Sequence, residues 1–250
     1  MSDALRLIRD SFPDRPAFGT AVSEAILMRV AAGELGGTVR LHRPGPELAF
    51  SKQDAASPGF SAAVAAARGV GFEPVLRLAG GRAAVFHEGT LALARATPAA
   101  HPARTTRERF EEVAATITAA LRRLGVDARI GEVPGEYCPG AFSVNAGGRL
   151  KLAGIGQRLI KGAAHVGCVI VAGGGQELRS VLAPVYEALE IEWDPATAGS
   201  VDEVVPGVTT ADVEAAVLAQ LGDRFELAEV DLDPDTLALA ERLEPRHRAG

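Results

Sequence analysis

The chain has few of the residues on which several specialised protein classes depend. Of its 250 residues only two are cysteine, Cys138 and Cys168, and 5% are aromatic. Secreted proteins of this length usually carry several cysteine pairs, so two cysteines indicate a reducing, cytoplasmic setting. The five histidines show no metal-ligand spacing with the cysteines, and we expect no metal site.

Positive charge and long apolar runs are also scarce. A formal net charge of −6 and the low aromatic content argue against nucleic-acid binding. No segment approaches the roughly twenty apolar residues of a membrane helix, and the opening MSDALRLIRD lacks the apolar core of a signal peptide. The chain has no Gly-x-Ser-x-Gly elbow, which disfavours a serine hydrolase.

Periodicity and turn residues predict an alternation of helices and strands. The predicted helices are residues 20–32, 60–68, 106–124, 177–189 and 210–221, with a weaker one from 233. The predicted strands are 38–42, 47–50, 74–78, 83–86, 90–95, 128–130, 142–144, 150–152 and 166–171, and 195–206 is a loop. Thr105 and Glu108 fit a capping box, and Gly125 can end that helix.

This order favours an α+β, or mixed α/β, fold with mixed, largely antiparallel sheets flanked by helices rather than a doubly wound sheet. We expect one domain over residues 1–250. Its core is about 15–220, and 221–250 is a C-terminal extension too short to be a full accessory domain.

The most informative stretch is residues 131–172. It places Cys138 before Pro139-Gly140, a hairpin turn at Gly147-Gly148, and Lys151 on the returning strand. A thiolate is a nucleophile, so Cys138 is a candidate for acyl-transfer chemistry. The alternative is a small buried side chain, the usual fate of a free cysteine. Cys168 lies in a continuous apolar run, which indicates core packing.

Lys151 alternates with Leu150 and Leu152, so it either faces solvent on an exposed strand or has a function. The surrounding segment 149–161 contains two lysines and two arginines but no acidic residue. Such a local excess of positive charge can polarise an acyl carbonyl, bind phosphate or attract an acidic partner.

Two further segments carry weaker signals. Gly80 and Gly81 lie between Arg77 and Arg82, and paired glycines let a backbone approach a ligand closely, although most such pairs are only turns. His87 precedes Gly89 in a predicted hairpin; it can assist proton transfer, but a lone histidine is more often structural.

Taken in order, these segments resemble the lipoate–protein ligase and octanoyltransferase superfamily, whose fold is shared with biotin–protein ligases. The most specific block is Lys151-Leu152-Ala153-Gly154 with Gln157-Arg158. The resemblance implies an acyl pocket between the Gly80-Gly81 loop and the Lys151 strand, with Lys151 contacting the acyl carbonyl. It also implies acyl or substrate contacts for Arg77, Gly80, Gly81, His87, Gly154 and Gln157.

Two differences from the ATP-dependent ligases indicate the subclass. Arg82 stands where ATP-dependent ligases usually have a third glycine, and little chain follows Leu221. Tyr137-Cys138-Pro139-Gly140 instead resembles the cysteine-dependent octanoyl and lipoyl transferases that work with glycine-cleavage H protein. In another octanoyltransferase branch the cysteine follows the lysine, which makes Cys168 a necessary control.

The resemblance therefore implies an octanoyl or lipoyl transferase that uses a Cys138 thioester and needs no cofactor. The implied acceptors are lipoyl-domain proteins, namely glycine-cleavage H protein and the E2 subunits of 2-oxoacid dehydrogenases, with acyl carrier protein as a donor. The alternatives are a lipoate–protein ligase that uses ATP and Mg²⁺, and a non-catalytic acyl-binding module.

Overall fold

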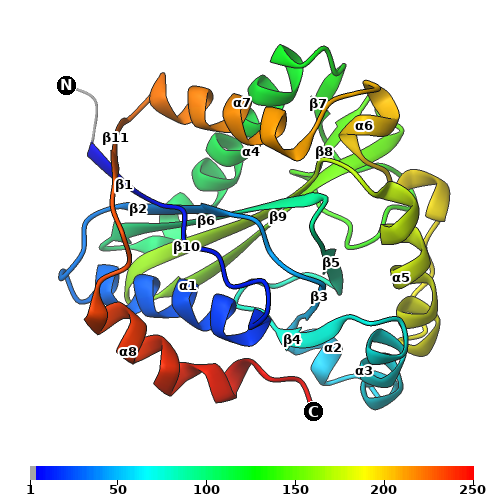
Figure 1. Ribbon diagram of the computed structural model, residues 1–250, viewed down its shortest axis with the longest axis horizontal. Helices are drawn as coiled ribbons and strands as arrows, with labels where there is room; N and C mark the ends of the chain where they lie inside the picture. Colours follow the sequence, from blue (N-terminus) through cyan, green and yellow to red (C-terminus); the bar gives the residue numbers. More distant parts are fainter. Residues whose placement is uncertain (1–3) are drawn as a thin grey trace.

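The computed structural model describes residues 4–250, which form an eight-stranded sheet and a three-stranded sheet with helices on their faces (Figure 1). The strands are β1 (Ala4–Ile8), β2 (Thr38–His42), β3 (Glu47–Phe50), β4 (Glu73–Leu76), β5 (Ala84–Phe86), β6 (Thr90–Ala99), β7 (Ala128–Ile130), β8 (Val144–Ala146), β9 (Leu150–Ile160), β10 (Gly162–Val171) and β11 (Glu226–Glu229). The helices are α1 (Pro16–Ala31), α2 (Lys52–Ala55), α3 (Phe60–Gly69), α4 (Thr106–Arg123), α5 (Gly175–Ala188), α6 (Val201–Val204), α7 (Thr210–Gly222) and α8 (Pro234–Leu243).

The strand order confirms the predicted fold class. The large sheet runs β11-β1-β2-β6-β10-β9-β8-β7, and the small sheet runs β4-β3-β5. Among residues 4–250, the parallel strand pairs of the large sheet are β1–β2 and β1–β11, and its other pairs are antiparallel. In the small sheet β3 is parallel to β4 and antiparallel to β5. The sheets are thus mixed and largely antiparallel.

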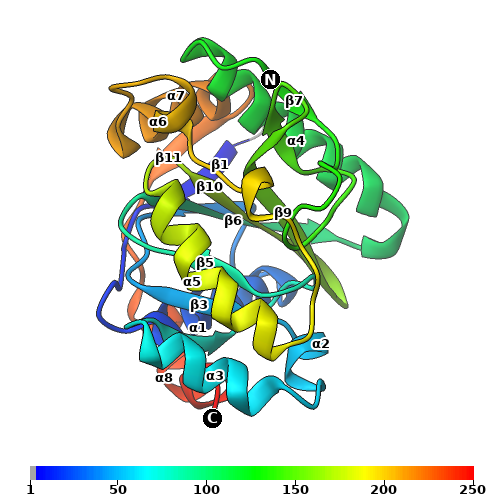
Figure 2. The ribbon, with the colours of Figure 1, turned by 90° about the vertical axis from the view of Figure 1, so that its right-hand side faces the viewer.

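Helices cover both faces of the large sheet. On one face α1 packs on β6 and β10, and α8 packs on α1; on the other face α4 and α7 pack together over the strands. The helices α3 and α5 lie side by side on the small sheet (Figure 2). Alternation along β2 sends Val39 and Leu41 into the core beneath α4, which leaves Arg40 on the opposite face.

Several local predictions were wrong. Both β1 and β11 were missed, and the strand expected at 142–144 begins at Val144. Thr105 makes no capping bond to the backbone of α4 and instead accepts a hydrogen bond from Arg109. The predicted loop 195–206 contains α6. The strands β5 and β6 belong to different sheets, so His87 lies in a turn between sheets rather than in a hairpin.

Residues 221–250 return to the body of the fold, because β11 pairs with β1 and α8 packs against α1. Within residues 4–250, none of the helices combines the length and the apolar character needed to span a bilayer.

Gly59 provides a test of the packing between α3 and α5. A Cβ at residue 59 would lie 1.8 Å from the backbone oxygen of Ala188, so Gly59→Ala forces the two helices apart. We expect the free energy of unfolding to fall by about 1–3 kcal/mol in urea denaturation. Gly69→Ala, at the opposite end of α3 with no atom within 4 Å of the new Cβ, is the control and should leave stability unchanged or raise it. Equal stability of both variants would contradict the packing described.

Candidate active site

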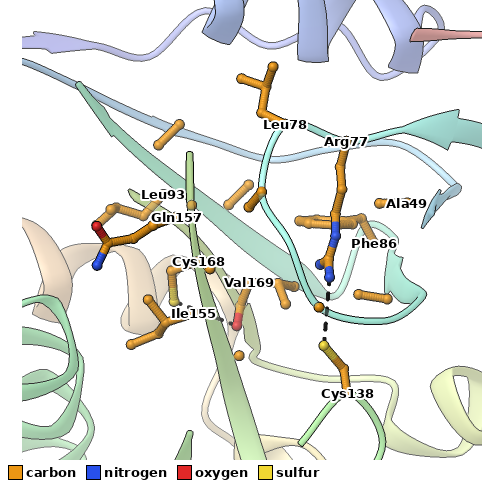
Figure 3. A pocket seen from close by; sticks show the side chains of 18 of the residues that line it. Ala49, Arg77, Leu78, Phe86, Leu93, Cys138, Ile155, Gln157, Cys168 and Val169 are labelled. Carbon is orange, nitrogen blue, oxygen red and sulfur yellow. Dashed lines mark hydrogen bonds between the residues drawn. The ribbon is translucent and has the colours of Figure 1, made fainter. Parts of the chain in front are cut away.

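A cavity of about 530 Å³ lies between α1, the large sheet and the small sheet. Its volume is in the range of small-molecule sites. Apolar side chains, among them Leu78, Phe86, Ile155 and Val169, surround it (Figure 3). The cavity therefore suits an apolar ligand.

Strand register explains why the cavity is open across the sheet. Ala94 of β6 pairs with Gly167 of β10, which pairs with Gly156 of β9; in the next row Ala92 and Gly154 flank Val169. Residues paired across strands point to the same face. Small residues on three adjacent strands thus leave an elongated channel.

Cys138 lies in the loop between β7 and β8, at the wall of this cavity. Its φ of 43° is in the left-handed region, which is unusual for a non-glycine residue and further disfavoured before proline. Hydrogen bonds hold this conformation: Cys138 N donates to the Tyr186 hydroxyl at 3.0 Å, and Cys138 O accepts from Lys151 Nζ at 2.7 Å. Backbone strain of this kind is concentrated at functional sites.

Two donors and two positive charges act on the Cys138 sulfur. Sγ accepts from Arg77 Nη2 at 3.6 Å (Figure 3). It also accepts from Arg82 N at 3.1 Å. Burial raises the pKa of this thiol, but the charges of Arg77 and Lys151 and the two hydrogen bonds outweigh burial, so the pKa falls below its ordinary value. The site therefore favours the thiolate.

Gly81 allows the Arg77 guanidinium and the Arg82 N–H to approach the Cys138 sulfur. Its φ is 102°, and a Cβ there would lie 2.8 Å from Cys138 Sγ and 2.6 Å from Arg77 Nη2. Only glycine meets both conditions without displacing the thiol or the guanidinium.

Lys151 is buried, with 1% of its surface exposed, so the solvent-exposed alternative is wrong. Nζ donates to Glu136 Oε1 at 3.2 Å, Tyr137 O at 2.9 Å and Cys138 O at 2.7 Å, which uses all three ammonium donors. A register shift between β8 and β9 at Val144/Asn145 gives β9 an extra residue. Such a bulge re-aims side chains, and Lys151 Cε lies 3.5 Å from the place of a Cβ on Gly154, on the cavity face.

Glu136 is the main site residue that the sequence did not indicate. Its side chain is fully buried beside Lys151. Oε1 accepts from Lys151, from the Ser143 hydroxyl and from Gly140 N, and Oε2 accepts from Val133 N. One carboxylate thus ties together the loop on both sides of Cys138. Three of its partners, Val133, Gly140 and Ser143, lie in the same loop within seven residues of it, but they form no recognised sequence motif.

The structure brings all the predicted site residues except His87 to the cavity, namely Cys138, Lys151, Arg77, Gly80, Gly81, Gly154 and Gln157. Gln157 is held by Arg109 Nε at 3.0 Å and donates to Thr106 O at 2.7 Å. His87 lies outside the cavity lining; its Nδ1 accepts from Gly89 N at 3.0 Å and is 3.6 Å from Glu177. Among residues 4–250, no three metal-ligating side chains are grouped together.

Cys168 also lines the cavity, on β10. Burial raises the pKa of its thiol to about 12, and it packs in the main hydrophobic core. An unionised thiol is a poor nucleophile. Of the two cysteines, only Cys138 combines access to the cavity with a lowered pKa, and the arrangement suits attack by sulfur on an acyl carbonyl.

Sequence comparisons identify the family to which the chain belongs. Residues 15–222 match the family described as lipoyl protein ligase A/B catalytic domain. Two curated relatives are named octanoyl-[GcvH]:protein N-octanoyltransferase. The protein from Geobacillus kaustophilus is 28% identical over 65% of this chain and 57% of the relative. The protein from Anoxybacillus flavithermus is 31% identical over 71% of this chain and 63% of the relative. The match therefore spans less than two thirds of either relative.

Solved structures show the same fold. A lipoate-protein ligase A bound with ATP superimposes with a TM-score of 0.78 at 20% identity, over 98% of this chain and 95% of the other. A bipartite lipoate protein ligase from Thermoplasma acidophilum gives 0.73 at 18% identity, over 98% and 93%. With the family match covering residues 15–222, the chain belongs to the lipoyl protein ligase A/B catalytic domain family.

Proposed function

We propose that this protein transfers an octanoyl or lipoyl group to a lysine of a lipoyl-domain protein through a thioester on Cys138. The observation that carries the proposal is the Cys138 sulfur at the wall of an apolar cavity, beside Arg77 and the Arg82 N–H, with its pKa lowered. The names of the curated relatives support the octanoyl class.

The proposed reaction has two acyl transfers. The Cys138 thiolate attacks the carbonyl carbon of a donor thioester; the new C–S bond forms, the donor C–S bond breaks, and the departing thiolate takes a proton from water. An acyl-lysine donor would react in the same way, with the departing amine taking the proton. The neutral amine of the acceptor lysine then attacks the enzyme thioester, loses a proton and restores the Cys138 thiolate.

Arg77 is the side chain best placed to bind the acyl carbonyl oxygen. Its Nη2 lies 3.6 Å from the sulfur and already donates to Gly80 O and Arg82 O, both at 2.7 Å. The donor left for a carbonyl is its buried Nε, which has no hydrogen-bond partner within the described part of the chain. An oxyanion donor typically lowers a barrier by about 2.7–4 kcal/mol. Because the three N–H groups of Lys151 already have acceptors, Lys151 acts through its charge. Gly80, Gly81, Gly154 and Gln157 line the acyl channel.

We propose glycine-cleavage H protein and the E2 subunits of 2-oxoacid dehydrogenases as acyl acceptors or donors, with acyl carrier protein as a further donor. The relatives' names include GcvH, and the Thermoplasma ligase is described as part of a lipoylation system with its E2 lipoyl domain. The proposed transfer uses no cofactor. A thiol nucleophile suits a reducing compartment, so we place the reaction in the cytoplasm.

Replacing Cys138 tests the thioester directly. Incubation of the protein with octanoyl carrier protein should add one octanoyl group, measured by intact mass. Cys138→Ser should gain no octanoyl group, not even as an oxygen ester, because a hydroxyl at this site is far less readily ionised than the thiol. Cys168→Ser, the matched control, should form the thioester at the wild-type rate.

Three outcomes of that experiment would contradict the proposal. Wild-type acyl transfer by Cys138→Ser would exclude the covalent route. Transfer that requires ATP and Mg²⁺ and proceeds without an adduct would assign a ligase. Tight acyl binding with neither adduct nor ATP dependence would assign a binding module.

Arg77→Met tests the origin of the lowered thiol pKa. Loss of the guanidinium removes a charge and a hydrogen bond that favour the thiolate, so the pH profile of Cys138 alkylation by iodoacetamide should move to higher pH. Arg77→Lys, which keeps a positive charge, should shift this pH profile part of the way back to that of the wild-type protein. Arg82→Met keeps the backbone N–H that contacts Sγ and serves as the control. An unchanged pH profile in Arg77→Met would show that the Arg77 guanidinium does not lower the pKa of Cys138.

A further inference from the structure

One face of α1 borders the cavity, and the proposed mechanism gives it no role. Pro16, Gly19, Thr20 and Ser23 line the same cavity as Cys138. Their spacing of i, i+3, i+4 and i+7 places them on one face of the helix. None of them carries a long apolar side chain, so this face leaves space at the α1 end of the cavity.

Strand register places Gly19 far from β9. Gly19 O accepts a hydrogen bond from Arg40 Nη1 at 2.7 Å, and Arg40 on β2 pairs with Ala94 on β6. Ala94 pairs in turn with Gly167, and Gly167 pairs with Gly156 on β9. These three strand spacings amount to roughly 14 Å.

The β9 end of this row lies beneath the loop that contacts the sulfur. A Cβ on Gly156 would lie 3.3 Å from Gly80 O, and a Cβ on Gly81 would lie 2.8 Å from Cys138 Sγ. With C–C bonds of about 1.5 Å, an extended eight-carbon chain spans roughly 10 Å. An octanoyl group with its carbonyl at the sulfur therefore spans most of the distance and places its last carbons near α1.

The fold of α1 does not require glycine at position 19. Its φ is not positive, and a Cβ there would meet no atom within 4 Å. Glycine inside a helix is less stable than alanine, because it loses more conformational freedom on folding. Gly69 and Gly222, which are equally open, are instead the last residues of α3 and α7, where glycine is common. Gly19 therefore makes the helix less stable and leaves a space beside the cavity unfilled.

We propose that Gly19 determines the length of the acyl chain that the cavity accepts, by leaving room against α1 for the last carbons of an eight-carbon chain. A side chain at this position fills that room and shortens the channel from its distal end. The inference rests on the proposed function for the orientation of the chain, with its carbonyl at Cys138.

Calorimetric titration with hexanoate and octanoate tests the role of Gly19. The unmodified protein should bind octanoate at least about tenfold more tightly than hexanoate, because two more methylene groups are buried. Gly19→Leu should remove this preference and still bind hexanoate, since the leucine side chain occupies only the space of the last carbons. Gly19→Ala adds one carbon and should reduce the preference about fourfold.

Gly69→Leu is the matched control, because it makes the same substitution at an open glycine outside the cavity lining. It should keep the full preference for octanoate. Gly19→Ala should also raise the midpoint of thermal unfolding, so the test does not depend on the folding of Gly19→Leu. An unchanged preference in Gly19→Ala, or in folded Gly19→Leu, would overturn the inference. A lower unfolding midpoint in Gly19→Ala would also overturn it, because packing would then require the glycine.

A parallel mass measurement with hexanoyl and octanoyl carrier protein separates this inference from the proposed function. A binding preference that changes with residue 19, without any adduct on Cys138, would keep the role of Gly19 and reject the thioester. An octanoyl adduct on Cys138, with a length preference that does not respond to residue 19, would keep the thioester and reject the role of Gly19.

Discussion

A buried ion pair between Lys151 and Glu136 fixes the loop on which the proposed chemistry depends. The ammonium also binds the carbonyls of Tyr137 and Cys138, and the carboxylate also binds the backbone at Val133 and Gly140. Removing one partner of such a pair typically destabilises a protein by about 3–5 kcal/mol, because the other charge stays buried. The pair therefore holds Cys138 in a strained conformation that its own sequence disfavours.

The same arrangement sets the chemistry of the sulfur. Once the loop is fixed, Sγ meets the Arg82 N–H and the Arg77 guanidinium. Glycine at position 81 permits that contact, since any side chain there would collide with both groups. The alanines and glycines of β6, β9 and β10 leave the adjoining channel open. The strained loop, the nearby positive charge and the open channel thus all meet at the Cys138 sulfur.

Much of this was predictable from sequence because it depends on local patterns. The bounds of β2 and β3 follow from alternation between clear turns, and the Gly147-Gly148 turn brings Lys151 back toward Cys138. The strands β1 and β11 were missed because they pair with segments far apart in the chain. The β9 bulge was missed for a related reason, because the register shift exists only in the paired strands. Glu136 was missed because its bonds within the loop follow no sequence motif and its bond to Lys151 depends on how that loop meets β9. His87 matched the family pattern but points to Gly89 and α5 instead of the cavity.

A crystal structure of the protein after reaction with octanoyl carrier protein would test the central claim most directly. The account predicts continuous electron density from Cys138 Sγ into the channel over Gly154 and Gly156, with the loop geometry around Lys151 and Glu136 unchanged. An acyl chain bound elsewhere, or one lying in the channel without a bond to Cys138, would contradict it.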